Sequence, residues 1–357
     1  MDEQVVRREK ALKPLMDQFV CVRLVRAETL DLSVFQFDPD LSFAVFLLNA
    51  DKTVYGRYGS RSDLYEAERD ISTQGLAKAL AGALELHKNY TRVRSSLAAK
   101  SAPTRYRKLA DFPSQQGRGG RGFRGGRGRC THCHDLRTAE QLSFRLQGQP
   151  IPDRVMFSWP MPDAPGLHLD PKDMATVNKV WAKSPAEKAG FKVGDRIESL
   201  NGQPILSIAD VQWVLQNAGD EDSLTTVVRR GDDSETIDWK LTKGWRRYVD
   251  ISWRTTTDVL RRSLMYRIEY DDISPDERKA LGLSSSVIAL KAARGVSRGS
   301  GTPVVREDVI IAVDGKDDYM SEGDLIAYFV QEKKRGDTVK VTVIRDGRKI
   351  DVDVPVK

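Results

Sequence analysis

Two cysteines and a neighbouring histidine are the residues of this sequence whose types and spacing most directly suggest chemistry. They lie in the segment CTHCH, as Cys130, Cys133 and His134. Cys-x-x-Cys-His is the pattern at which two thiolates become attached to a c-type haem while the histidine ligates the iron. The same residues could instead hold zinc together with His132 or His168, or they could be an unmodified cysteine pair at the start of a helix. The sequence leaves these three alternatives open.

The composition is that of an ordinary globular protein, with 40% hydrophobic and 30% charged residues. A length of 357 residues predicts two or three domains, and three cysteines cannot build a disulfide scaffold. No apolar run approaches the roughly 20 residues of a transmembrane helix, so we expect no membrane span. No basic and then apolar leader follows Met1, so the sequence as given shows no signal peptide.

An arginine- and glycine-rich tract holds much of the net charge of +6. The tract GRGGRGFRGGRGR, residues 117–129, cannot bury enough surface to offset the entropy cost of ordering it. We therefore predict a flexible linker over residues 93–129. An RNA-binding role would use Phe123 as a stacking platform, but one aromatic residue in one short tract favours a solvated linker, and nucleic acid is not an expected partner.

The N-terminal region, residues 1–92, shows an alternation of helix and strand patterns. The expected elements are a helix within 5–16, a mostly buried strand at 19–25, two strands within 40–58 joined by Asn49-Ala-Asp51, and a helix over 72–88. Cys21 lies inside the first strand pattern, where we expect a small buried hydrophobic residue.

This order of elements, with the segment FAVFLLNADKTVYGRYG, resembles the later part of a thioredoxin-like α/β fold. The family's redox Cys-x-x-Cys precedes its first long helix, and no cysteine stands ahead of that helix here. The resemblance therefore implies either a redox-inactive thioredoxin-like domain or a chain whose true start, with a first strand and a cysteine pair, lies upstream.

The segment SPAEKAGFKVGDRIESLNGQP, residues 184–204, has the clearest pattern of local structure. Pro185 can begin a short helix, Gly190 can end it in a left-handed conformation, and Asn201-Gly202 is a tight-turn dipeptide after a strand. The segment resembles the centre of a PDZ domain of the Deg-type (high-temperature-requirement) proteases. We assign residues 164–243 to this first PDZ domain and residues 130–163 to a separate CxxCH segment.

The PDZ resemblance implies a peptide groove. Domains of this family bind protein C-termini or extended peptides by adding them as a strand beside a helix, and a loop of backbone N–H groups holds the terminal carboxylate. The helix is expected at 208–217. The implied peptide-binding residues are Gly166, Leu167, His168 and Leu169 in the loop and Ile208, Val211 and Leu215 on the helix.

The same elements recur after an expected ordered connector that begins near Trp245. EDVIIAVDG, residues 307–315, repeats GDRIESLNG, and a capped helix pattern precedes it at 274–282. The loop that corresponds to the carboxylate loop, residues 265–268, has no glycine, so peptide binding is less expected in this second copy, residues 244–357. The predicted fold is thus an α/β thioredoxin-like domain followed by two α+β PDZ domains, each a partly open barrel of five to six strands with two helices.

The function expected from these resemblances is that of a non-enzymatic PDZ scaffold or regulatory protein. Deg proteases also carry a trypsin-like domain, but no Gly-x-Ser-Gly-Gly context occurs here, so proteolysis is not supported. The order of parts resembles bacterial proteins, frequent in planctomycetes, that combine a thioredoxin-like region, a CxxCH motif and Deg-type PDZ domains. This implies a location in the periplasm or cell envelope if the true N-terminus lies upstream. The alternatives are a haem-carrying electron-transfer protein and, more distantly, RNA binding through residues 117–129.

Overall fold

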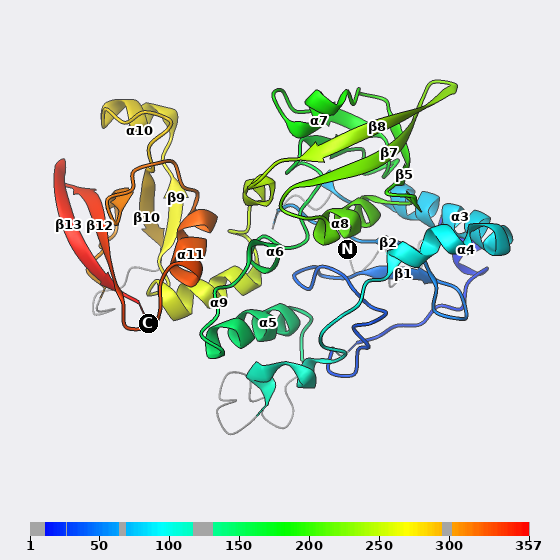
Figure 1. Ribbon diagram of the computed structural model, residues 1–357, viewed down its shortest axis with the longest axis horizontal. Coiled ribbons are helices and arrows are strands. Elements are labelled where there is room, and N and C mark those ends of the chain that lie inside the picture. Colours follow the sequence, from blue (N-terminus) through cyan, green and yellow to red (C-terminus); the bar gives the residue numbers. More distant parts are fainter. Residues whose placement is uncertain (1–10, 26, 64–68, 117–130, 295–301, 357) are drawn as a thin grey trace. The chain divides into compact units, whose positions relative to one another are not determined.

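The structure is a computed structural model that describes residues 11–25, 27–63, 69–116, 131–294 and 302–356. The chain divides into two compact units (Figure 1). The first unit comprises residues 1–139 and 157–249, and the second comprises residues 140–156 and 250–357. The N-terminal region and the first predicted PDZ domain therefore belong to the same compact unit.

The N-terminal part of the first unit consists of helices around one hairpin. Its elements are α2 (Lys13–Met16), β1 (Val45–Leu48), β2 (Val54–Tyr58), α3 (Thr73–Lys88) and α4 (Tyr90–Leu97). Strands β1 and β2 pair antiparallel around the predicted turn, and α3 begins where the Ser72 side chain accepts a hydrogen bond from Gly75 N–H. The predictions of the hairpin and of the helix over 72–88 are confirmed.

The predicted buried strand at 19–25 is wrong. In the structure these residues belong to no strand, Val20 and Val22 are 94% and 77% exposed, and Cys21 is exposed rather than buried. The β-branched pattern suits an extended chain, but a strand also needs a neighbour. Among the described residues, β1 and β2 form a sheet of only these two strands.

The predicted flexible linker is also wrong over residues 93–116, while residues 117–129 lie outside the described part. Helix α4 continues into 3-10 turns at Ala98–Lys100, Leu109–Asp111 and Pro113–Gln115. Lys100 is completely buried, and its side chain lies 2.8 Å from the carboxylate of Asp210. A buried ion pair fixes this segment, and the composition gave no sign of it.

The predicted PDZ elements of the first unit are present at the expected positions. They are β3 (Leu167–Leu169), β4 (Val177–Val180), α7 (Pro185–Ala189), β5 (Arg196–Leu200), β6 (Gln203–Pro204), α8 (Ile208–Asn217), β7 (Asp222–Arg230) and β8 (Asp233–Leu241). The strands form a β3-β4 pair and a four-stranded sheet in the order β6-β5-β7-β8. Within the described residues we see these two sheets and no closed barrel.

Three residues near the ends of α7 explain where this helix begins and ends. Ser184 accepts a hydrogen bond from Glu187 N–H, Pro185 occupies the first helical position, and Gly190 ends α7 with φ +92°.

After the last strand a short 3-10 turn, Trp245–Tyr248, buries Trp245, whose indole N–H donates to Gly219 O at 3.0 Å. The connector after β8 is therefore ordered, as predicted.

The second unit is built around one five-stranded sheet in the order β13-β12-β11-β10-β9. Its elements are α6 (Asp153–Met156), α9 (Thr255–Leu264), β9 (Glu269–Asp272), α10 (Pro275–Ala280), β10 (Leu290–Arg294), β11 (Val309–Val313), α11 (Glu322–Gln331), β12 (Thr338–Arg345) and β13 (Arg348–Pro355). Helix α5 (His134–Leu146) crosses the boundary between the two units. The capped helix predicted before β10 is confirmed as α10, with Ser274 and Glu277 forming a capping box.

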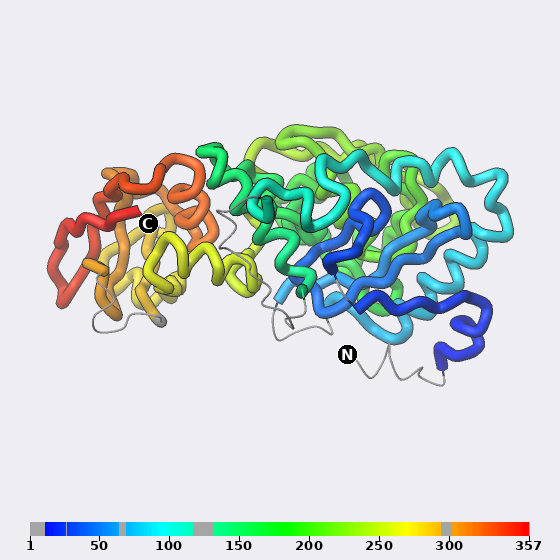
Figure 2. The backbone as a smooth tube through the Cα atoms, turned by 90° about the horizontal axis from the view of Figure 1, so that it is seen from below, coloured from blue at the N-terminus to red at the C-terminus, as the bar shows by residue number. Residues whose placement is uncertain are grey.

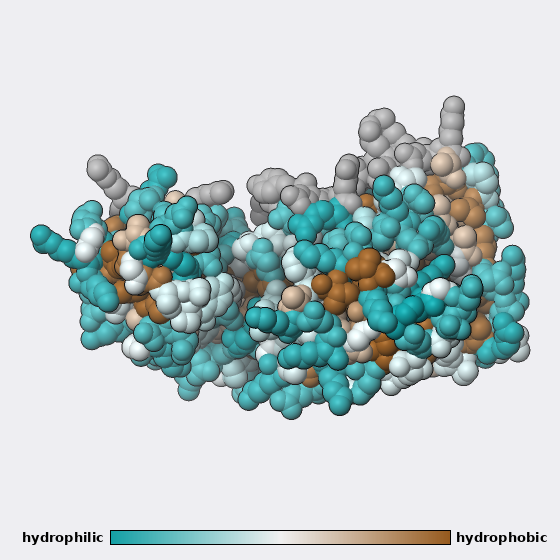
Figure 3. Space-filling view, turned by 90° about the horizontal axis from the view of Figure 1, so that it is seen from above, coloured by the Kyte–Doolittle hydropathy of each residue, from teal (hydrophilic) through white to brown (hydrophobic). Residues whose placement is uncertain are grey.

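The N-terminal region and the first PDZ domain share one hydrophobic core. Leu76 and Leu80 of α3 belong to the same buried cluster as Val211 and Leu215 of α8. Figure 2 shows the blue N-terminal tube running along the green PDZ segment. No helix among the described residues is long and apolar enough to cross a membrane, and on the face in Figure 3 hydrophobic residues appear as separate patches among hydrophilic ones.

Candidate functional site

The predicted peptide groove of the first PDZ domain lies between β3 and α8, and its residues are covered. The loop and helix residues lie in or directly before the elements expected for them, β3 and α8, and their role in peptide binding stays a prediction. Leu167, Leu169, Ile208, Val211 and Leu215 are each at most 2% exposed, Gly166 is buried, and only His168 is partly exposed. Apart from His168, these side chains are therefore not accessible to a ligand in this structure.

The carboxylate loop uses its own N–H groups internally. Leu167 N–H donates to Pro162 O at 2.8 Å, and Gly166 N–H donates to Asp163 O at 3.0 Å. Gly166 has φ +105°, and a Cβ there would collide with the side chain of Ser184. The glycine is therefore required here for its backbone conformation and for the close approach of α7.

His168 is bound to an acidic residue beside the same loop. Its Nδ1 lies 3.2 Å from Asp163 Oδ1, which also accepts a hydrogen bond from Trp181 Nε1 at 3.3 Å. The hydrogen bond to Asp163 raises the pKa of His168. The His168 side chain therefore stabilises the loop through its hydrogen bond with Asp163.

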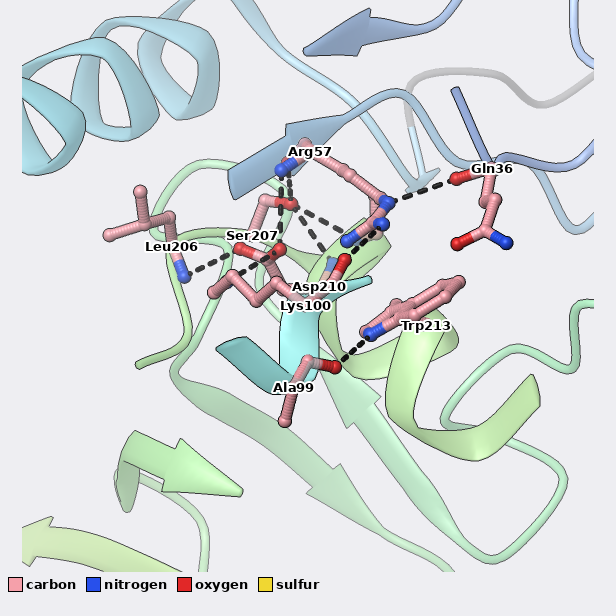
Figure 4. Close-up of polar contacts among 9 residues, drawn as sticks. Gln36, Arg57, Ala99, Lys100, Leu206, Ser207, Asp210 and Trp213 are labelled. Carbon is pink, nitrogen blue, oxygen red and sulfur yellow. Dashed lines mark hydrogen bonds and ion pairs between the residues drawn. The ribbon is translucent and has the colours of Figure 1, made fainter. Parts of the chain in front are cut away.

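Strand β2 of the N-terminal region lies against the start of α8 (Figure 4). Arg57 N–H donates to Asp210 Oδ1 at 3.2 Å, and Ser207 Oγ donates to the carbonyl oxygen of Arg57. Gly56 permits this approach, because a Cβ there would lie 2.8 Å from Leu206 Cδ1. The backbone of β2 is thus bound to the groove helix on the side that carries Asp210.

Two buried cations lie around that carboxylate (Figure 4). Lys100 Nζ is 2.8 Å from Asp210 Oδ1, with both side chains 1% exposed. Arg57 places its guanidinium 4.0 Å from the ring centre of Trp213 and donates from Nη2 to Lys100 O at 2.6 Å. Burial lowers the pKa of Lys100 and lowers the pKa of Arg57 to about 10. Sequence reasoning missed this cluster, although an aspartate within the apolar pattern of α8 was a signal for it.

Helix α3 covers the groove elements at two further points. The Ser72 hydroxyl donates to Pro171 O at 2.8 Å, and Lys78 Nζ is 2.5 Å from Asp173 Oδ1, both in the loop that follows β3. A Cβ on Gly82 would lie 2.7 Å from Leu206 Cδ2, just before α8. The N-terminal region therefore contacts the end of β3 and the start of α8 together.

The described part of the CxxCH segment does not present a ligand thiolate. Cys130 lies outside the described residues, and Cys133 packs against the apolar cluster that contains Leu136. Burial raises the pKa of the Cys133 thiol, whereas haem attachment and zinc binding both use the thiolate. His134 stacks on His132 with ring centres 5.3 Å apart. No group of three metal-binding side chains converges among the described residues, which do not include Cys130. The haem and zinc hypotheses stay predictions.

Comparison with known protein families identifies PDZ domains in both compact units. One PDZ domain model matches residues 176–230 and a second matches residues 292–356. The chain therefore contains two PDZ domains. It is 25% identical over 185 residues, 52% of its length, to a probable periplasmic serine endoprotease DegP-like of Pseudomonas putida, and covers 38% of that relative.

Two further similarities are of the same kind. Over 78 residues, 22% of its length, the chain is 33% identical to a probable periplasmic serine protease do/HhoA-like of Haemophilus influenzae, and it covers 17% of that relative. The chain thus spans well under half the length of these relatives. Among solved structures, the HtrA3 PDZ domain bound to a phage-derived ligand matches with 26% identity and a TM-score of 0.18 over 19% of this chain and 64% of that chain. The HtrA-type protease AlgW with a decapeptide matches with 15% identity and a TM-score of 0.23 over 38% and 41%.

Proposed function

We propose that this protein is a non-enzymatic PDZ scaffold of the cell envelope that binds protein C-termini or extended peptides. Two PDZ domains support the mode of binding, and the periplasmic names of the DegP-like relatives support the location. The N-terminal region, which we interpret as a redox-inactive thioredoxin-like remnant, serves as the cover of the first groove.

The observation that supports the proposal is the packing of the N-terminal region against the elements that border the first groove. Asp210 of α8 binds the backbone of β2, and the Ser72 hydroxyl before α3 donates to Pro171 O in the loop after β3. Val211 and Leu215 belong to the same buried cluster as Leu76 and Leu80 of α3. In this proposal a peptide that enters the groove displaces the N-terminal region. Because an equilibrium between covered and open states reduces the apparent affinity by the open fraction, the intact chain should bind weakly and an opened chain tightly.

A matched pair of variants in α3 tests the proposal. Gly75→Val places a branched side chain against the carbonyl oxygen of Pro171, and Ala81→Val makes a comparable addition at an exposed position of the same helix. We expect Gly75→Val to bind members of a C-terminal peptide library at least about tenfold more tightly than the wild-type chain and Ala81→Val. Adding Val211→Asp should abolish the gain.

Circular dichroism and the melting temperature establish that each variant is folded. If Gly75→Val is not folded, Gly82→Val, which presses on Leu206 instead, takes its place. A folded, opened variant that binds no peptide from a broad library would contradict the proposed function of the first groove.

A further inference from the structure

In the second PDZ domain, β9 and α11 correspond to the strand and the helix that border the peptide groove of this family. Strand β9 is at the edge of its sheet, paired on one side with β10. Strand addition would use its free edge. At that edge the N–H of Tyr270 donates to Oε1 of Glu322, the first residue of α11, at 3.0 Å. A side chain from the groove helix therefore already occupies a donor that an added strand would use.

The Glu322 carboxylate is held by three donors. In addition to Tyr270 N–H, Arg261 of α9 donates from Nε to Oε1 at 2.9 Å and from Nη2 to Oε2. This is the paired fork by which arginine recognises a carboxylate. Arg261 and Glu322 are only 5% and 7% exposed. The guanidinium of Arg261 and the N–H of Tyr270 thus form a carboxylate-binding site, which the side chain of Glu322 occupies.

The loop before β9 adopts a left-handed conformation without a glycine. It begins directly after α9, at Met265, and its Tyr266 and Arg267 have φ +57° and +68°. Non-glycine residues in this left-handed region each cost free energy. The absence of glycine from residues 265–268 therefore does not prevent the loop from adopting a left-handed conformation.

We propose that Glu322 is an internal ligand of the second PDZ domain, and that this groove accepts extended peptides that bring a carboxylate of their own to Arg261. The inference rests on the proposed peptide-binding function. A neutral strand would be a poor replacement for Glu322, because the buried Arg261 guanidinium would lose the carboxylate that pairs with it directly and keep only the more distant charges of Glu269 and Asp258. The carboxylate could be a C-terminus or an acidic side chain.

Chemical rescue tests the carboxylate site without any peptide. In the full chain, Glu322→Ala vacates the site, and Glu332→Ala at the C-terminal cap of α11 is the exposed control. We expect Glu322→Ala to have a lower melting temperature that millimolar acetate or formate raises more than equimolar chloride does. The wild type, Glu332→Ala and Glu322→Ala combined with Arg261→Met should show no such rise.

Peptide binding separates this inference from the general function. Three versions of one peptide are compared: with a free C-terminus, amidated with an internal glutamate, and amidated without an acid. We expect Glu322→Ala to bind at least one carboxylate peptide about tenfold more tightly than the wild type does, and the neutral peptide no better. The carboxylate peptide whose affinity increases shows whether the carboxylate that Arg261 binds is a C-terminus or an acidic side chain.

The outcomes distinguish the two claims. Equal binding of neutral and acidic peptides by the variant, or a folded variant that neither anion rescues, would overturn the inference. Rescue by acetate without binding of any peptide would support the carboxylate site and contradict peptide binding by this groove. If Glu322→Ala is not folded, the isosteric Glu322→Gln is used, with the same expected preference for carboxylate peptides.

Discussion

The buried pair of Lys100 and Asp210 gives the sharpest test of how the segment after α4 is held against the helix α8. Lys100→Met keeps most of the side-chain volume and removes the ammonium group that lies 2.8 Å from Asp210 Oδ1. The Asp210 carboxylate keeps its hydrogen bonds from the N–H groups of Arg57 and Leu206, at 3.2 and 3.0 Å. It loses its direct counter-ion in a site that is 1% exposed.

The size of the effect follows from burial. Removing one partner of a buried ion pair costs about 3 to 5 kcal/mol, because the other charge remains without compensation. The nearby Arg57 guanidinium and the two backbone donors offset part of this cost, so we expect about 3 kcal/mol. At about 1.4 kcal/mol per tenfold change, this lowers the stability constant of the first unit roughly a hundredfold.

Urea unfolding followed by tryptophan fluorescence measures this change, since Trp213 and Trp239 are buried in the first unit. A double-mutant cycle with Asp210→Asn separates the pair from its surroundings: the double variant should be clearly more stable than the sum of the single changes predicts. Lys88→Met is the control, because the ion pair of Lys88 with Glu85 is exposed and should contribute at most about 1 kcal/mol.

Two results would refute this reasoning. One is a free energy of unfolding for Lys100→Met within about 0.5 kcal/mol of the wild type, the range of ordinary surface substitutions. The other is strict additivity of Lys100→Met and Asp210→Asn, which would show that the two groups do not interact. Either result would mean that the ion pair of Lys100 with Asp210 does not stabilise the contact of residues 93–116 with α8.

Three further predictions concern titration and reactivity. Burial raises the pKa of Tyr58 from 10 to about 12. The protonated phenol therefore contributes about 3 kcal/mol to the free energy of unfolding below pH 10, and this contribution is lost as the pH rises through 12. Between pH 9 and pH 12 the free energy of unfolding should decline less steeply for Tyr58→Phe than for the wild type. Iodoacetamide should label exposed Cys21 well before half-buried Cys133, whose raised pKa keeps the thiol protonated; equal rates in peptide mapping would contradict this placement. Asp163→Asn should lower the pKa of His168 measured by NMR, and an unchanged value would rule out the bond between them.

The local elements of both PDZ domains were predictable from the sequence. Ser184, Pro185 and Gly190 define α7, and the Ser274 capping box defines α10. The sequence also indicated the bounds of α8. These features depend on residues a few positions apart, which is why a pattern in one dimension reveals them.

Other expectations failed because they depended on neighbours distant in the sequence. Val20 and Cys21 have the residue types of a buried strand, but the described hairpin gives them no partner strand. Lys100 looked like part of a solvated linker, yet it is buried against a carboxylate of the groove helix.

The sequence by itself predicted two PDZ domains, which the family matches confirm, and a set of residues for the first groove. Only the tertiary structure showed that most of these residues are buried and that Glu322 is bound by Arg261 and by the N–H of Tyr270. An apolar face has the same pattern whether it awaits a ligand or packs against another part of the chain. Burial is set by long-range packing, and an ion pair such as that of Arg261 with Glu322 joins residues 61 positions apart.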